Sequence, residues 1–180
     1  MAEEQAAPLR PRTQQIVAAA RELVEAEGVE ALSMRRLAER LGIRAPSIYK
    51  HLPDKAALEN ALISATFEEQ AAEFETALVD AADPLAAIAG AYRKFAHCHP
   101  HLYRLMTERP LDRDRLTPGV EDRAAQPIVQ ALGGDRDLAR AVWAFAHGMT
   151  ILELNDRFPR HADLEAAWQR GLDALRPKGT

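Results

Sequence analysis

Apolar residues recur every three or four positions along most of this chain, a period that is typical of amphipathic helices. Ile16, Ala20, Leu23 and Val24 form one such stripe within residues 13–27. No window alternates apolar and polar residues for long, and alanine and leucine, which favour helix, supply many of the apolar positions. The pattern therefore predicts an all-α fold of about nine helices.

Glycine, proline and capping residues mark where the predicted helices begin and end. After residues 13–27 we expect helices over about 34–41, 45–52, 55–79, 84–98, 100–106, 121–132, 135–155 and 162–175. Ser33 is the expected N-cap of the second helix, because its hydroxyl can accept a hydrogen bond from a free amide of the first turn. Pro127 lies inside the seventh helix and is expected to kink or interrupt it. The charged segment 108–117 contains Pro110 and is predicted to be a loop.

A short basic window has the pattern of a helix, a glycine turn and a second helix. Residues 33–55 contain six cations and two carboxylates, whereas the whole chain has a net charge of −4. The cations are Arg35, Arg36, Arg40, Arg44, Lys50 and Lys55. Charge clusters are usually solvated helix faces, but helix, turn and helix at this spacing is the geometry that places a second helix in the major groove. The window therefore favours a DNA-binding helix-turn-helix.

Composition excludes several other classes of protein. No apolar run reaches the ~18 to 20 residues that cross a bilayer, and the N-terminus lacks the apolar core of a signal peptide. Cys98 is the single cysteine, so an intramolecular disulfide is excluded. The sequence contains no Gly-rich phosphate loop, nucleophile elbow or HExxH pair. We therefore expect a cytoplasmic protein that does not span a membrane, is not an enzyme and needs no cofactor.

The basic window resembles the DNA-binding domain of the TetR family of bacterial transcriptional regulators. The family's signature of tyrosine, aromatic or histidine, apolar residue and lysine is present here as Tyr49, His51, Leu52 and Lys55. The resemblance covers about residues 12–60 without a gap. Leu52 stands where phenylalanine is commoner, which predicts a change in packing only. Residues 44–46 stand where many members have a serine or threonine cap, and this is where base specificity would be set.

The resemblance implies how such a protein works. It implies an N-terminal arm and helix-turn-helix domain over residues 1–55, and a helical effector-binding and dimerisation domain over residues 56–180. Contacts to a double-stranded DNA operator are expected from Ser33, Arg44, Ala45, Ser47, Tyr49, Lys50, His51 and Lys55. Of these, Ser33, Tyr49 and Lys55 are expected to hold phosphates, although Tyr49 could instead pack on the first helix.

The expected function is a regulator, in the form of a repressor that a small apolar or amphipathic molecule releases from its operator. The alternative is a helical nucleoid-associated or protein-interaction module that senses no small molecule. Sequence-independent affinity for DNA would favour the alternative.

A second resemblance concerns the C-terminal part of the chain. Trp143, His147 and Gly148 are similar to the Trp-x-x-x-His-Gly pattern of one C-terminal subgroup of the family. Trp143 and His147 are four residues apart and share a helix face. Contacts to a ligand are expected from Tyr92, Phe95, Tyr103, Met106, Trp143 and His147. The alternative is a packed tryptophan and a core histidine with satisfied hydrogen bonds, with Gly148 allowing a close helix contact.

The last two predicted helices carry long apolar stripes, which the family resemblance assigns to a homodimer interface. The stripes consist of Ala139, Val142, Ala146, Met149, Leu152, Leu164, Ala167, Trp168, Leu172 and Leu175. Each helix must also pack within its own subunit, so some of these side chains are expected to face inward.

Histidines cluster around Pro100, where one helix is predicted to end and another to begin. His97, His99 and His101, together with Cys98, are side chains that zinc and copper accept as ligands. No carboxylate stands at supporting spacing nearby, and the helix break does not require the three rings to converge. We therefore expect a polar helix end rather than a metal site.

Overall fold

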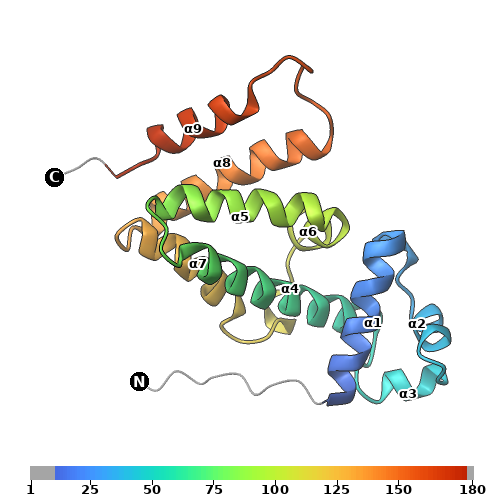
Figure 1. The fold of residues 1–180 in the computed structure, drawn as a ribbon. Helices are drawn as coiled ribbons and strands as arrows, with labels where there is room; N and C mark the ends of the chain where they lie inside the picture. Colours follow the sequence, from blue (N-terminus) through green and yellow to red (C-terminus); the bar gives the residue numbers. More distant parts are fainter. Residues whose placement is uncertain (1–10, 178–180) are drawn as a thin grey trace, which may run out of the picture. The chain divides into compact units, whose positions relative to one another are not determined.

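The computed structural model describes residues 11–177, which form nine α-helices and two short 3-10 helices, with no strand in that range (Figure 1). The all-α prediction is confirmed. Packing divides the chain into two compact units. Unit 1 runs to Glu69 and also contains His99–Glu121, and unit 2 contains Gln70–Cys98 and the chain from Asp122 onward. The predicted arm over residues 1–10 lies outside the described residues, and the predicted functional division at residue 55 stays a prediction.

Unit 1 is built around helices whose apolar faces follow the predicted stripes. Its elements are α1 (Pro11–Glu27), η1 (Val29–Ala31), α2 (Met34–Arg40), α3 (Ala45–Tyr49), the first part of α4 (Lys55–Leu78), α6 (Pro100–Thr107) and η2 (Arg113–Arg115). Ile16, Leu37, Ile48 and Leu58 are fully buried in this unit and lock α1 to α4 into one core. Gly28 follows α1 with φ of 83°, a backbone conformation that favours glycine and ends the helix there.

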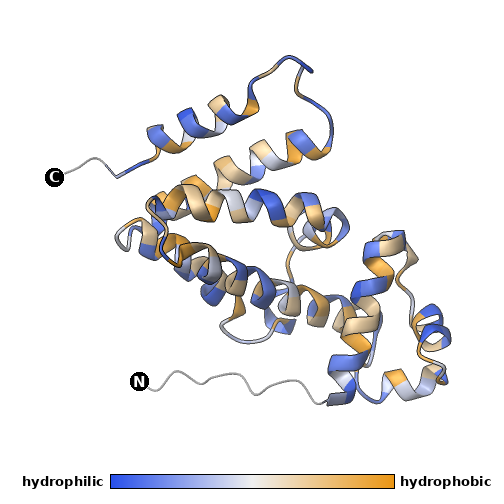
Figure 2. Ribbon diagram, viewed as in Figure 1, coloured by the Kyte–Doolittle hydropathy of each residue, from blue (hydrophilic) through white to orange (hydrophobic). Residues whose placement is uncertain are grey.

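Unit 2 contains the remaining helices. They are the second part of α4, α5 (Pro84–Cys98), most of α7 (Val120–Ala131), α8 (Arg136–Leu154) and α9 (Leu164–Ala174). Apolar and polar positions alternate around each helix, as expected when one face is buried (Figure 2). Asp135 and Asp163 cap α8 and α9 by accepting hydrogen bonds from amides of their first turns. Phe74 of α4 stacks on Tyr92 of α5, with ring centroids 6.4 Å apart.

The structure corrects one boundary prediction. Pro127 does not interrupt its helix, because α7 runs continuously from Val120 to Ala131. The proline forfeits its own amide hydrogen bond, but its ring is buried, and that apolar contact offsets part of the loss. The predicted loop 108–117 is confirmed except for the single turn of η2. Within residues 11–177, no helix is long and apolar enough to cross a membrane.

Candidate DNA-binding interface

Helices α2 and α3 and the turn between them form a helix-turn-helix. Ser33 caps α2 as predicted, since its Oγ accepts a hydrogen bond from the Arg36 amide at 3.2 Å. Gly42 turns the chain with φ of 63°, and the Ile43 amide then donates to the carbonyl of Ala38 at 3.0 Å. These local bonds fix where α3 begins, and the fully buried Ile48 holds α3 against the core.

At the start of α3, the side chain of Arg44 does not cap the helix. Arg44 occupies the N-cap position with an extended backbone, and its side chain makes no capping hydrogen bond. Pro46 lies in the first turn, where its missing N–H removes one of the amides that a cap would have to satisfy. The α3 N-cap position is therefore occupied by Arg44 rather than by a serine or threonine, and its exposed guanidinium remains available for a partner.

The structure gathers the predicted DNA contacts in the helix-turn-helix and at the start of α4. The eight residues are Ser33 at the start of α2; Arg44, Ala45, Ser47, Tyr49 and Lys50 in or beside α3; His51 just after it; and Lys55 at the start of α4. Arg44, Tyr49, Lys50 and Lys55 are exposed, and Tyr49 is one of the few large apolar side chains on the described surface, at 49% exposure. Ser33 uses an oxygen lone pair for the cap and keeps its hydroxyl proton available to donate.

The arginines of α2 are largely neutralised within the fold. Arg36 pairs with Glu27 of α1 at 2.5 Å, and Arg40 pairs with Glu22 at 2.9 Å. Arg35 pairs with a carboxylate of its own helix at 3.2 Å. In contrast, among residues 11–177 the structure gives no ion pair to Arg44 or Lys50. The cationic charge that remains for a partner is therefore concentrated around α3 rather than spread over the whole basic window.

The start of α4 carries the last predicted contact. Asp54 caps this helix, because its Oδ1 accepts a hydrogen bond from the Ala57 amide at 2.6 Å. That amide, together with the guanidinium of Arg115, lowers the pKa of the Asp54 carboxyl. Lys55 follows directly, and its Nζ lies 3.5 Å from Oε1 of Glu59. An exposed lysine at a helix N-terminus opposes the helix dipole, and a phosphate bound there would relieve that mismatch.

The six predicted ligand contacts do not share one kind of environment. Tyr92 and Phe95 of α5 are buried in the core of unit 2. Tyr103 and Met106 of α6 are buried in unit 1. Trp143 and His147 of α8, in contrast, lie at the surface: the rings stack 5.9 Å apart, and Trp143 is 48% exposed. The contact of all six with a ligand stays a prediction.

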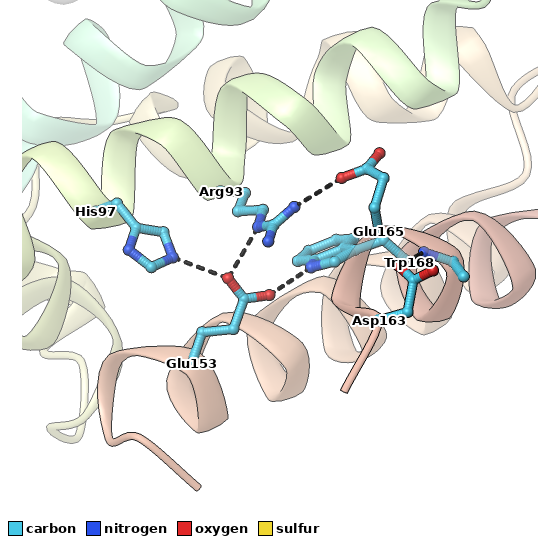
Figure 3. Close-up of polar contacts among 7 residues, drawn as sticks. Arg93, His97, Glu153, Asp163, Glu165 and Trp168 are labelled. Atoms are coloured by element: carbon cyan, nitrogen blue, oxygen red, sulfur yellow. Dashed lines mark hydrogen bonds and ion pairs between the residues drawn. The ribbon is translucent and has the colours of Figure 1, made fainter. Parts of the chain in front are cut away.

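A buried carboxylate joins α5, α8 and α9 within unit 2 (Figure 3). Glu153 of α8 accepts hydrogen bonds from Arg93 Nε at 2.8 Å and Trp168 Nε1 at 2.5 Å, and its Oε2 lies 2.9 Å from His97 Nε2. Burial by itself raises the pKa of this carboxyl, but the bonds with Trp168, Arg93 and His97 outweigh it and hold the pKa below 4.5. Arg93 also lies over the Trp168 ring and pairs with Glu165 of α9.

Two open grooves border this polar cluster. One of about 310 Å³ lies between α5 and α9 and includes Arg93, His97 and Trp168 in its lining. The other, of about 550 Å³, is lined by Arg93, His97 and Glu153 together with apolar residues that include Phe158. Both volumes fall in the range of small-molecule sites.

The histidines around Pro100 take separate partners. His97 pairs with Glu153 in unit 2, whereas His99 Nδ1 lies 2.7 Å from Glu25 Oε1 in unit 1. His101 lies beside Gly28. In the described part of the chain, no group of three or more His, Cys, Asp or Glu side chains is placed to hold a metal ion.

Sequence reasoning missed the carboxylates that neutralise α2 and the polar cluster around Glu153. Glu27 and Arg36 are nine residues apart, and Glu153 and Arg93 are sixty apart. Neither pair stands at the three- or four-residue spacing from which a contact within one helix can be predicted. A weaker signal was present in Trp168, because a tryptophan in an apolar stripe needs an acceptor for its indole N–H when it is buried.

Two family descriptions together match most of the chain. Residues 16–62 match the bacterial regulatory proteins of the tetR family, and residues 85–175 match the tetracyclin repressor-like C-terminal domain. An uncharacterized HTH-type transcriptional regulator of Mycobacterium tuberculosis is 29% identical over 159 residues, which cover 83% of this chain and 73% of that protein. The class A tetracycline repressor of transposon 1721 from Escherichia coli is 43% identical over 61 residues, which are 34% of this chain and 27% of the repressor.

Solved structures agree on the fold. A protein of unknown function from Rhodococcus sp. RHA1 superposes with a TM-score of 0.76 at 25% identity, over 96% of this chain and 97% of that one. The multidrug binding protein EbrR, complexed with imidazole, superposes with a TM-score of 0.70 at 24% identity, over 100% and 99% of the two chains. The second likeness supports the fold alone.

Proposed function

The chain belongs to the TetR family of DNA-binding transcriptional regulators, and from that premise we propose that it is a homodimeric repressor that a small molecule releases from its operator. The observation that carries the proposal is the contrast in charge between α2 and α3. The arginines of α2 are held by carboxylates of the fold, whereas Arg44 and Lys50 beside α3 are exposed and have no ion pair among the described residues. Such a repressor acts in the cytoplasm, where the bacterial chromosome lies.

In this proposal α3 enters the major groove, and the surrounding residues hold the DNA backbone. Arg44, Ala45 and Ser47 are at the start of α3, the end that approaches base edges in helix-turn-helix proteins. Tyr49 and Lys55 donate to phosphates, and these contacts give affinity without sequence information. Ser33, Lys50 and His51 complete the predicted interface from its rim.

The homodimer would form through the exposed faces of α8 and α9. At 100° per residue, Ala141, Ala144, Gly148 and Leu152 fall within one arc of α8, and Leu152 is 39% exposed. On α9 the exposed face is also rich in alanine. Small side chains let helices of two subunits approach closely, and Trp143, which is exposed about 100° around α8 from Ala144, offers a large apolar contact outside this arc. Five of the predicted stripe residues are already buried within the subunit: Ala139, Val142, Ala146, Trp168 and Leu172.

The small-molecule site has two candidate positions in unit 2. The predicted contacts in this unit are Trp143 and His147 of α8, together with Tyr92 and Phe95, which are buried among apolar side chains. The open grooves offer a second position, where Arg93 and His97 would hold the polar end of an amphipathic molecule. In either position the ligand must bind the state that does not fit the operator more tightly than the state that does, because only a difference in affinity shifts the equilibrium.

The DNA-binding proposal is tested with Lys55→Ala and a matched control, Lys94→Ala, which removes an exposed lysine from α5. The probe is a labelled duplex enriched by the wild-type protein from a random-sequence pool, titrated by fluorescence anisotropy at several salt concentrations. Loss of one phosphate contact per subunit should reduce the magnitude of the slope of log K against log salt by up to roughly 0.9 per contact. Lys94→Ala should leave both the affinity and the slope unchanged.

Equal affinity and equal slope for Lys55→Ala and the wild type would overturn the proposed interface. A duplex of scrambled sequence provides the other comparison. If it binds as tightly as the enriched duplex, the protein is a sequence-independent DNA-binding module rather than an operator-specific repressor.

A further inference from the structure

Lys55 lies between two carboxylates at the start of α4. Asp54 precedes it and caps the helix, and Glu59 lies one turn further along with its Oε1 3.5 Å from the lysine Nζ. That Oε1 atom is buried and accepts no hydrogen bond, so its charge is balanced only by nearby cations. Left to itself, Glu59 would compete with a DNA phosphate for this lysine.

Residues 108–117, which we call the strap, follow α6 and lie along the first turns of α4 within unit 1. Arg115 Nη1 donates to both carboxylate oxygens of Asp54 at 3.1 Å. The Thr117 amide donates to Ser64 Oγ at 3.0 Å, and Leu116 between them is buried. These contacts fix the C-terminal end of the strap against α4.

The other end of the strap reaches the second carboxylate. Arg109 Nη2 donates to Glu30 of η1 at 2.8 Å, and its Nη1 lies 3.7 Å from Oε1 of Glu59. Glu59 Oε1 is therefore shared between Lys55 and Arg109. Both carboxylates beside Lys55 receive an arginine from the same short segment.

We propose that the strap sets the strength of DNA binding: Arg115 holds Asp54, and Arg109 shares the charge of Glu59, which weakens the hold of Glu59 on Lys55 and makes the lysine more available to a phosphate. The inference rests on the proposed phosphate contact of Lys55 and names how that contact is controlled. Arg109 and Arg115 also pair with Glu30 and Asp112, at 2.8 and 3.4 Å, so the strap acts by sharing the charge of Glu59 and Asp54 rather than by adding net positive charge. Without the strap, Lys55 would face Glu59 without the competing arginine.

The position of the strap in the chain would allow the C-terminal domain to regulate DNA binding. It lies within residues 85–175, which match the C-terminal domain of the family, yet it packs in unit 1 with the DNA-binding helices. A rearrangement of the C-terminal domain that withdraws Arg109 would strengthen the existing pair between Lys55 and Glu59 without any change in α3. The exposed ion pairs of the strap are weak individually, and weak contacts suit a segment that must be displaced.

A double-mutant cycle tests the proposal with the same enriched duplex and the anisotropy assay. Arg109→Ala should weaken DNA binding by about two- to fivefold, the range of a partly exposed ion pair. Glu59→Gln should strengthen binding by a similar factor, because the competing charge is gone. In the double variant the Arg109 effect should vanish, because Arg109 acts through Glu59. Arg113→Ala is the matched control, since Arg113 belongs to the strap but pairs with Glu121.

Two outcomes would overturn the inference. If Arg109→Ala weakens binding equally in the wild-type and Glu59→Gln backgrounds, Arg109 contacts DNA directly and Glu59 does not compete for Lys55. If Glu59→Gln leaves affinity unchanged while Lys55→Ala lowers it, the lysine binds phosphate but the strap does not control it. An unchanged affinity for Lys55→Ala would instead refute the proposed phosphate contact itself. Circular dichroism melting of each variant shows whether an affinity change arises from unfolding.

Discussion

Replacement of Glu153 by glutamine should destabilise the fold more than any surface charge change in unit 2. The carboxylate side chain is 4% exposed and interacts with Arg93, His97 and Trp168, one group from α9 and two from α5. Glutamine keeps the shape of the side chain but has one acceptor oxygen instead of two and carries no charge. Its NH₂ group must therefore face either the Trp168 indole N–H or the Arg93 guanidinium.

The expected cost follows from that mismatch. One buried donor left without an acceptor costs about 1–3 kcal/mol, and the bonds that remain lose the assistance of the negative charge, which is worth about 1 kcal/mol more. Arg93 limits the loss, because it keeps its ion pair with Glu165 and is itself partly exposed. We therefore expect Glu153→Gln to reduce the free energy of unfolding by about 2–4 kcal/mol.

The measurement is urea unfolding followed by far-UV circular dichroism at a fixed protein concentration, because the stability of the proposed dimer would depend on concentration. Glu165→Gln is the matched control: it removes a carboxylate that pairs with the same arginine but is 84% exposed, so it should cost less than about 0.5 kcal/mol. A loss below about 1 kcal/mol for Glu153→Gln, or a loss equal to that of the control, would refute the reasoning.

Three further outcomes follow from the contacts. The pKa of Glu153 is lower in the folded protein than its ordinary value of 4.5, so the stability that this carboxylate contributes is present above pH 4.5 and is lost as the pH falls through the folded-state pKa. The free energy of unfolding should therefore fall less steeply with acid for Glu153→Gln than for the wild type. Gly171→Ala should lower the melting temperature, because the new Cβ would lie 2.1 Å from Phe145 Cζ, and overpacking costs about 1–3 kcal/mol; Phe145→Leu should relieve much of that cost. Ser33→Ala should cost about 1 kcal/mol in chemical unfolding by removing the acceptor of the Arg36 amide, and Ser33→Thr should retain most of the stability.

The helices of the fold could be predicted from the sequence because the signals that begin and end them are local. Ser33 as a cap, Gly42 as a turn and Pro84 at a helix start each act within one turn of the chain, and each is found where it was predicted. The predicted interruption at Pro127 is wrong: the rule that proline breaks a helix is local, and here burial of the ring in the core offsets part of the lost hydrogen bond. Trp143 illustrates a different limit: its apolar character is evident from the sequence, but only packing shows that it is half exposed on α8.

The charge of the basic window shows most clearly what the sequence leaves undetermined. Counting residues 33–55 gives a strongly cationic window, but the fold brings Glu22 and Glu27 from α1 onto two of its arginines. All these ion pairs are exposed, so salt screens them as it screens contacts to phosphates. For Lys55 the two effects oppose each other, because salt that weakens its attraction to DNA also weakens the competition from Glu59. With the proposed phosphate contact of Lys55, a salt slope measured on the intact protein should therefore undercount the phosphate contacts, and the same slope measured on Glu59→Gln should be steeper.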